Sequence, residues 1–352
     1  MTPHMPRAAL AIALIGALIG GAVFAAPAQA LPSGRAQAAA PSAPASSAPA
    51  SSTPPASALK PAVGATTDEN GFEIDANGVL LRYTGSASDI TIPAKVTAIA
   101  DEAMRGTTAE RITVPATVRT IGDRAFADAQ QLKALVFEDT ADHPSQLTAL
   151  GAEAAANTPA LTEVAVPSKA ASLGEGAFAD SGITRLSLPD SLTSIPARMA
   201  QHTGLLEEVV VGDGVTEIGD SAFRSARELS GLGVRQADGS TTTGLPSSLM
   251  TIGQDAFTES GLRSIDLPAS VRSVGYGAFA EIPNLAHVGL NEGLASIGEF
   301  AFNNTGISEL VIPDSVTAVG GSAFGGNGSL TRVHIGRGAA AGQLSTVFAG
   351  SP

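Results

Sequence analysis

Short stretches in which apolar and polar residues alternate return along most of the chain. In LRSIDLP (residues 262–268) and ISELVIP (residues 307–313), large aliphatic residues occupy alternate positions just before a proline. A period of two predicts a short strand with one buried face. The proline lies where it can end a strand without removing a ladder hydrogen bond. The pattern therefore predicts one strand in each returning stretch.

A second motif, aliphatic-Gly-x-x-Ala-Phe, precedes these strands. It occurs as TIGDRAF, EIGDSAF, TIGQDAF, SVGYGAF, SIGEFAF and AVGGSAF. Seven of the nine intervals between the opening aliphatic residues are 22 or 23 residues long. These residues are Ile99, Ile121, Leu150, Leu173, Ile195, Ile218, Ile252, Val274, Ile297 and Val319. A period this short, sustained over about ten units, predicts a solenoid of stacked coils.

The two longer intervals carry polar insertions at residues 139–146 and 235–244, which we expect to be loops. Because stacked coils repeat at the strand spacing, each apolar residue should lie on its counterpart in the next coil. The motif phenylalanines are thus predicted to form a buried ladder of Phe126, Phe178, Phe223, Phe257, Phe279, Phe302 and Phe324. Acidic residues after the motif glycine, such as Asp123 and Glu299, favour the start of a short helical turn.

These units resemble the leucine-rich repeats of the bacterial surface-antigen type, called BspA-like, whose copies are close to L-T-x-I-x-I-P-x-S-V-T-S-I-G-x-x-A-F. The resemblance runs from Ile90 to about Ile335. It implies an α/β-type repeat solenoid with a continuous parallel β-sheet on one face and short helical turns on the other. Residues 70–93 also resemble the β-hairpin that opens such domains, with its turn at 75–78, and we expect this hairpin to cap the solenoid. The repeat departs from its pattern at Ala155 and Ala200, which replace the phenylalanine, so those coils should be looser.

The domain organisation follows from these patterns. Residues 1–30 are expected to be a signal peptide, with Arg7, an apolar stretch at 8–26 and an Ala28-Gln29-Ala30 cleavage pattern. Because the apolar stretch is long, an uncleaved N-terminal anchor is the alternative. Residues 31–67, rich in Ala, Pro and Ser, should be a disordered linker. A capping hairpin and leading strand at 68–98, repeats at 99–336 and an irregular C-terminal tail at 337–352 complete the chain.

Composition removes several classes of function. The chain has no cysteine, which excludes disulfides, thiolate metal sites and cysteine nucleophiles. A net charge of −13 without a basic cluster argues against nucleic acid and anionic lipid as partners. No catalytic motif occurs, and the histidines are too scattered to form a predicted metal site. We therefore expect no enzyme activity, no cofactor and no metal, and no membrane insertion after signal cleavage.

The remaining candidate is the outward face of the strands. Its residues are mostly small and uncharged: Thr113, Val136, Ala165, Ser187, Val210, Gly233, Asp266, Gly289, Val311 and His334. The preceding row includes Arg185 and His287, and its charges predict cross-strand ion pairs for Glu163-Arg185-Glu208 and Glu309-Arg332. At any single residue, an ordinary solvated surface is the simpler interpretation. As a whole, the face is hypothesised to be a shallow platform able to bind a protein or a glycan.

The resemblance implies an exported adhesin or interaction protein, secreted or on the cell surface, whose partner is an extracellular protein or glycan. A structural spacer of the cell envelope or matrix is the alternative hypothesis, and an enzyme inhibitor is a more remote one. The sequence leaves open the ligand, the mode of retention and the oligomeric state.

Overall fold

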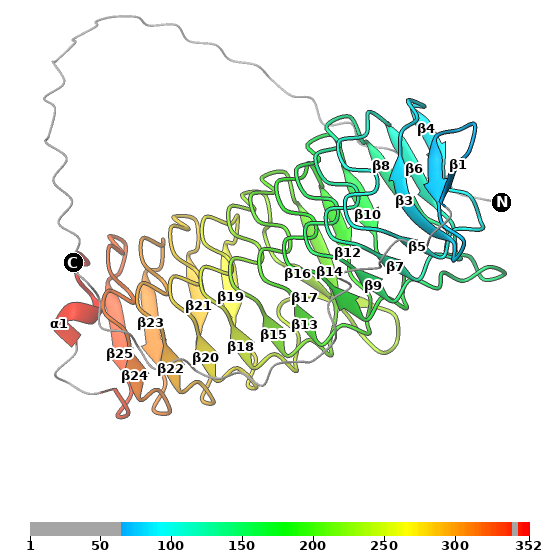
Figure 1. Cartoon of the computed structure of the whole chain (residues 1–352). Coiled ribbons are helices and arrows are strands. Elements are labelled where there is room, and N and C mark those ends of the chain that lie inside the picture. The colour runs from blue at the N-terminus through cyan, green and yellow to red at the C-terminus, as the bar shows by residue number, and fades with distance from the viewer. Residues whose placement is uncertain (1–64, 340–343) are drawn as a thin grey trace, which may run out of the picture. The chain divides into compact units, whose positions relative to one another are not determined.

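Each coil of the solenoid contributes two strands, where the sequence predicted one. The computed structural model describes residues 65–339 and 344–352, all within one compact unit, Thr53–Pro352. About eleven coils follow one another in chain order, and after the first coil each has a two-residue strand followed by a longer one (Figure 1). The additional strand arises because the motif's opening aliphatic residue is itself paired with its counterparts in the neighbouring coils.

The first strand of each coil contains two residues, except in the first coil. These strands are β3 (Val79–Tyr83), β5 (Ala98–Ile99), β7 (Thr120–Ile121), β9 (Ala149–Leu150), β11 (Ser172–Leu173), β13 (Ser194–Ile195), β15 (Glu217–Ile218), β18 (Thr251–Ile252), β20 (Ser273–Val274), β22 (Ser296–Ile297) and β24 (Ala318–Val319). They form one parallel run from β3 to β11 and another from β13 to β24.

The second strand of each coil is the one that the alternating pattern predicted. These strands are β4 (Asp89–Thr91), β6 (Arg111–Val114), β8 (Ala134–Phe137), β10 (Glu163–Ala165), β12 (Arg185–Ser187), β14 (Glu208–Gly212), β16 (Leu232–Arg235), β19 (Ser264–Asp266), β21 (His287–Gly289), β23 (Glu309–Ile312) and β25 (Arg332–Ile335). Strands β4 to β16 form one parallel sheet, with β4 at its edge.

This sheet is not continuous along the solenoid, which corrects the sequence prediction. The insertion at 235–244 is not a loop but a hairpin, because β17 (Thr241–Thr243) pairs antiparallel with β16. Strand β17 therefore occupies the edge of β16 where the next parallel strand was expected. Beyond it, the described strands pair as β19 with β21 and as β23 with β25.

The motif glycine lets neighbouring coils approach closely. The Gly122 N–H donates to the Ile99 carbonyl at 2.8 Å, and the Gly151 N–H donates to the Ile121 carbonyl at the same distance. A Cβ added at Gly151 would lie 2.5 Å from the carbonyl carbon of Gly122. Only glycine fits this contact between backbones, which explains its recurrence.

The segments that follow the glycine are hydrogen-bonded turns rather than the helical turns predicted. We call them the turn row: residues 122–128 and their counterparts in the other coils. Arg124 and Asp128 have φ angles of 56° and 62°, in the left-handed region. The N–H groups of Arg124 and Phe126 donate to Ala152 and Ala154 of the next coil at 2.9 and 2.8 Å. An α-helix needs these groups for carbonyls four residues earlier, so none forms here.

The burial predicted for the aromatic ladder is confirmed in all seven coils, but the rings stack only from Phe223 to Phe324, and Phe126 and Phe178 are not part of that stack. All seven motif phenylalanines are at most 1% exposed. From Phe223 onward the rings stack without interruption, at centroid distances of 5.1 to 5.5 Å. Towards the N-terminus, Ala155 and Ala200 stand between phenylalanines and are themselves fully buried. The greater looseness expected at those two coils stays a prediction.

The C-terminal residues extend the turn row beyond the last coil. Helix α1 (Leu344–Val347) is the only helix among the residues described. The carbonyls of Thr346, Val347 and Ala349 accept hydrogen bonds from the turn row of the last coil at 2.8 to 3.0 Å. Phe348 stacks on Phe324 at 5.8 Å and so extends the aromatic ladder by one ring.

At the other end, two antiparallel strands precede β3, the first strand of the parallel run. β1 (Thr66–Thr67) pairs with β2 (Phe72–Ile74), and β2 pairs with β3. The turn between β2 and β3 lies at residues 75–78 as expected, and the buried Asp75 carboxylate accepts the N–H groups of Asn77 and Val79, both at 2.8 Å.

The expected signal peptide, and the linker up to residue 64, lie outside the described residues. Within residues 65–339 and 344–352, no helix combines the length and apolar character needed to cross a bilayer.

Candidate binding surface

The strand pairing aligns the predicted outward residues in columns. Thr113 lies beside Val136, Ser187 beside Val210, and Val311 beside His334. Strand β17 separates the strands up to β16 from β19 and those after it, so the structure brings these residues together in groups rather than in one row.

Exposure varies along this outward face. Ala165, Asp266, Val311 and His334 are exposed, whereas the remaining outward positions are half-buried: Thr113, Val136, Ser187, Val210, Gly233 and Gly289. Val311 is 60% exposed, which makes it one of the most exposed large hydrophobic residues among those described. The strand face therefore offers small and aliphatic side chains at differing depths.

The row of charges forms only some of the expected ion pairs. Arg185 Nε lies 3.8 Å from a Glu208 carboxylate oxygen, and Arg332 pairs with Glu309. The described residues contain no ion pair between Glu163 and Arg185, because the guanidinium of Arg185 is turned towards the opposite neighbour. His287, which was named as a candidate for binding, instead contacts Asp266 at 3.0 Å. All of these side chains are more than half exposed, so each pair contributes little stability.

Arg235 is a residue of this face that sequence reasoning missed. From β16 it reaches back to β12, where its Nη2 donates to the Ser187 hydroxyl at 3.0 Å and its Nη1 donates to the Leu188 carbonyl at 3.3 Å. Its guanidinium also pairs with Asp190. Ser187 is therefore partly engaged by the protein itself, and Arg235 forms part of the strand face.

The hairpin formed by β16 and β17 also explains a glycine at an outward position. A Cβ at Gly233 would lie 2.9 Å from the Thr241 methyl group. The threonines of β17 are all exposed, so the hairpin places a polar edge in the middle of the strand face.

The turn row carries a second set of charges. Arg105 contacts Asp128 at 2.7 Å and Glu102 at 3.0 Å, and Arg198 contacts Glu175 at 2.8 Å. A hydrogen bond from Asn157 and the nearby Arg105 guanidinium hold the pKa of Asp128 below its ordinary value. These contacts join successive coils and leave the charges of the turn row largely paired with each other.

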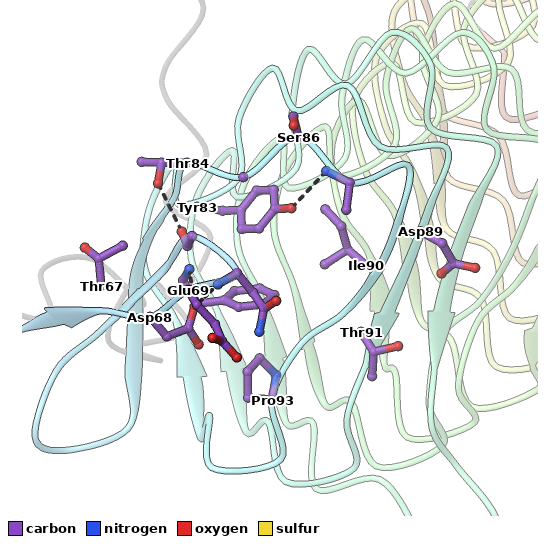
Figure 2. A pocket seen from close by; sticks show the side chains of 15 residues that line it. Thr67, Asp68, Glu69, Tyr83, Thr84, Ser86, Asp89, Ile90, Thr91 and Pro93 are labelled. Carbon is purple, nitrogen blue, oxygen red and sulfur yellow. Dashed lines mark hydrogen bonds between the residues drawn. The ribbon is translucent and has the colours of Figure 1, made fainter.

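A cavity of about 720 Å³ opens at the N-terminal end of the solenoid, beside β4. Its walls come from residues 67–72, from residues 83–87 and from β4 with Pro93 (Figure 2). Phe72 and Tyr83 lie against each other there, with ring centroids 4.9 Å apart. The repeat pattern does not predict this cavity, because the cavity is built from loops that do not repeat.

A metal site requires several ligand side chains close together. Across residues 65–339 and 344–352, no group of three or more His, Asp or Glu side chains is placed to hold a metal ion. His287 lies on β21 and His334 on β25, with β23 between them in chain order.

Comparison with known families agrees with this architecture. The profile of the BspA type leucine-rich repeat region matches the chain in six copies, over residues 80–143, 97–230 and 236–340. These stretches cover more than half of the sequence, so the protein belongs to the BspA-type leucine-rich repeat family. No curated protein matches the chain.

Several solved structures are similar to this protein. A leucine-rich repeat protein from Bacteroides ovatus is 19% identical, covers 78% of this chain and 87% of its own, and has a TM-score of 0.52. A leucine-rich cell surface protein from Faecalibacterium prausnitzii is 19% identical, with coverage of 82% and 98% and a TM-score of 0.44. The pneumococcal vaccine antigen PcpA is also 19% identical, with coverage of 79% and 83% and a TM-score of 0.49. The Bacteroides structure supports the leucine-rich repeat fold.

Proposed function

We propose that this protein is an exported interaction protein, secreted or held at the cell surface, that acts as an adhesin by binding an extracellular protein or glycan through the strand face. The observation that carries the proposal is the groups of small and aliphatic outward residues on paired strands, which include the strongly exposed Val311. Such a surface gives a partner a regular platform with few charges to desolvate.

Family membership supports the same class of function. BspA-type repeats are consistent with a role in protein interaction at a surface, and leucine-rich repeat proteins are typically not enzymes. The expected signal peptide supports export, and the acidic net charge of −13 disfavours nucleic acid as the partner.

We also assign to the N-terminal hairpin the role of covering the first coil. Ile90 on β4 and Ile92 just after it are 2% and 0% exposed, although no coil precedes them. By contrast, Val333 on the last long strand is 40% exposed. This difference supports a cap made by β2, β3 and the loops beside them, with Phe72 and Tyr83 as its apolar part.

Binding of the purified full chain to immobilised matrix proteins, a glycan array and isolated cell envelopes tests the proposal. The matched variant carries Val136→Glu, Val210→Glu and Val311→Glu on the strand face. A control variant carries Leu205→Glu, Met250→Glu and Tyr276→Glu, which are exposed apolar residues outside that face. We expect saturable binding that the first variant loses and the control retains.

The alternative function, a spacer of the envelope or matrix, makes the opposite prediction. It requires no saturable binding to any of these surfaces, or binding that both variants retain equally. Either result would contradict the adhesin proposal.

A further inference from the structure

Strand β4 is paired on one side only within the described part of the chain. It pairs with β6 and ends the eight-stranded sheet. The Ser88 carbonyl accepts the Arg111 N–H at 3.0 Å, and the Ile92 N–H donates to the Thr113 carbonyl at 3.0 Å. Because backbone groups alternate in direction along a strand, those of Asp89 and Thr91 face the opposite edge. This edge therefore offers donors and acceptors to an added strand.

The cavity described above lies along that free edge. Asp89, Ile90, Thr91 and Pro93 form one wall, and no residue of β6 contributes to it. Figure 2 shows the Ile90 side chain directed towards the Tyr83 ring, while the side chains of Asp89 and Thr91 point the other way. With its volume of about 720 Å³, the cavity is a groove between a strand edge and the loops of the hairpin, wide enough for a segment of extended chain.

The loop opposite β4 is held in place by its own hydrogen bonds. Asp68 accepts the N–H groups of Asn70 and Phe72, both at 3.0 Å, and Thr84 N–H donates to the Gly71 carbonyl at 2.9 Å. The Tyr83 hydroxyl accepts the Ala87 N–H at 3.4 Å. The groove is thus largely formed before a ligand arrives, which lowers the entropic cost of binding.

The charge of the groove selects the chemistry of its occupant. Asp68, Glu69 and Asp89 line it, and no Lys, Arg or His is among its lining residues. Phe72 and Ile90 are only 5% and 2% exposed, so the half-buried Tyr83 ring supplies most of the apolar surface that a ligand can reach. A strand added beside β4 would alternate between an inward position near the Tyr83 ring and an outward position near Asp89. Its side chains should accordingly alternate between apolar and basic.

We propose that this groove binds an extended segment of a partner protein, with alternating apolar and basic side chains, as an additional strand beside β4. Main-chain hydrogen bonds to Asp89 and Thr91 provide affinity, and the carboxylates and aromatic rings provide selectivity. This site is separate from the strand-face surface of the proposed function and does not depend on it.

The test uses the purified full chain and the labelled peptide Ac-VKVKVT-NH2, with binding followed by fluorescence anisotropy at low salt. Two comparison peptides are Ac-VEVEVT-NH2 and a copy of the first whose alternate backbone nitrogens are methylated. We expect the basic peptide to bind saturably and both comparison peptides to bind about tenfold or more weakly, since each loses either ion pairs or main-chain hydrogen bonds.

Variants of the protein test the same contacts from the other side. Thr91→Pro removes an N–H from the free edge without removing a bond to β6, and should weaken binding about tenfold. Thr91→Ala keeps that N–H and should bind as the unaltered protein does. The double variant with Glu69→Gln and Asp89→Asn should bind the peptide more weakly, and its binding should depend less on salt concentration. The variant with three strand-face glutamates should bind the peptide normally.

Three results would overturn the proposal. They are no binding of the basic peptide, equal binding of the methylated peptide, or concentration-dependent self-association that Thr91→Pro abolishes, which would assign the edge to a second copy of this chain. If Thr91→Pro proves unfolded by circular dichroism, the methylated peptide decides the question alone.

Discussion

At the scale of single residues, the fold depends on core side chains that pack against their counterparts in the neighbouring coils, and this packing determines which side-chain size fits. Phe279 lies between Phe257 and Phe302, with ring centroids 5.3 and 5.1 Å away, and is fully buried. A residue in this ladder contacts aromatic rings on two sides, so its loss leaves a cavity that neither neighbour can fill without moving.

Phe279→Ala should therefore lower the free energy of unfolding by about 3–5 kcal/mol, through lost apolar burial and the cavity left behind. Urea unfolding followed by circular dichroism measures this. The matched control is Phe300→Ala, since Phe300 is 37% exposed and lies outside the ladder, and it should cost less than about 1 kcal/mol. Equal losses in the two variants would contradict the ladder.

The motif glycine makes a second prediction at this scale. A Cβ at Gly253 would lie 2.7 Å from the backbone nitrogen of Asp220, whereas one at Gly321 would meet nothing within 4 Å. Gly253→Ala should lower the free energy of unfolding by about 1–3 kcal/mol because the coils must move apart. Gly321→Ala should change it by less than about 0.5 kcal/mol. Thermal unfolding compares the two, and a neutral Gly253→Ala would show that the coils are not held this closely.

Asp128 links stability to pH. Its hydrogen bond from Asn157 and its contact with Arg105 lower its folded pKa below the ordinary value of 3.8. A lowered folded pKa means that the charged carboxylate is favoured by folding, so its contribution is present above pH 3.8 and is lost as the pH falls through the lower folded value.

Asp128→Asn should therefore reduce stability at pH 7 and reduce the further loss between about pH 4 and pH 2. Melting temperatures across this range, with the exposed Asp142→Asn as control, measure the effect. The contribution is small because Asp128 is partly exposed. An unchanged pH dependence in Asp128→Asn would contradict the account.

The residues of the core could be predicted because their identity repeats with the coil, and each apolar position is therefore marked about ten times. The left-handed backbone of the turn row is marked in only some coils, by Gly176, Gly277, Asn157 and Asn304. Glu102, Arg124 and Glu153 occupy left-handed positions where glycine or asparagine would have signalled the conformation, and their acidic neighbours suggested helix starts instead.

At the scale of elements, the insertion at 235–244 shows where pattern reasoning fails. Strand β17 consists of three threonines, all exposed, so no alternation of apolar and polar residues marks it. The strand forms because it pairs with β16, where Gly233 and the preceding Gly231 leave room for it. Nothing in the local sequence shows that this pairing ends the eight-stranded sheet.

Arg235 anchors this hairpin to β12, which gives a prediction for the element. Arg235→Ala should free the hairpin and speed amide hydrogen exchange in residues 236–243, with a loss of about 1 kcal/mol from its charged hydrogen bonds. Lys133→Ala, which removes an exposed ion pair with Glu110, is the control and should leave exchange there unchanged. Exchange in 236–243 that does not respond to Arg235→Ala would contradict the anchoring role.

At the scale of the whole molecule, the parallel stack determines which surfaces are free for partners. In the core, aromatic rings stack on one another. In the turn row, backbone groups and charged side chains find their hydrogen-bond and ion-pair partners in neighbouring coils. The strand face and the groove beside β4 are the two surfaces that we propose to bind other molecules. The repeat indicated the first of these surfaces, whereas the groove depends on loops that occur once in the chain and could be found only from the structure.

The absence of cysteine makes the central claim directly testable. Single cysteines placed at Val311 and at Leu205, both 60% exposed, can each be coupled to a polyethylene glycol maleimide. Binding to the cell envelopes or matrix proteins is then measured before and after coupling. We predict that the polymer at Val311 blocks binding and that the same polymer at Leu205 does not. Binding that survives the polymer at Val311, or that is lost equally at Leu205, would contradict recognition through the strand face.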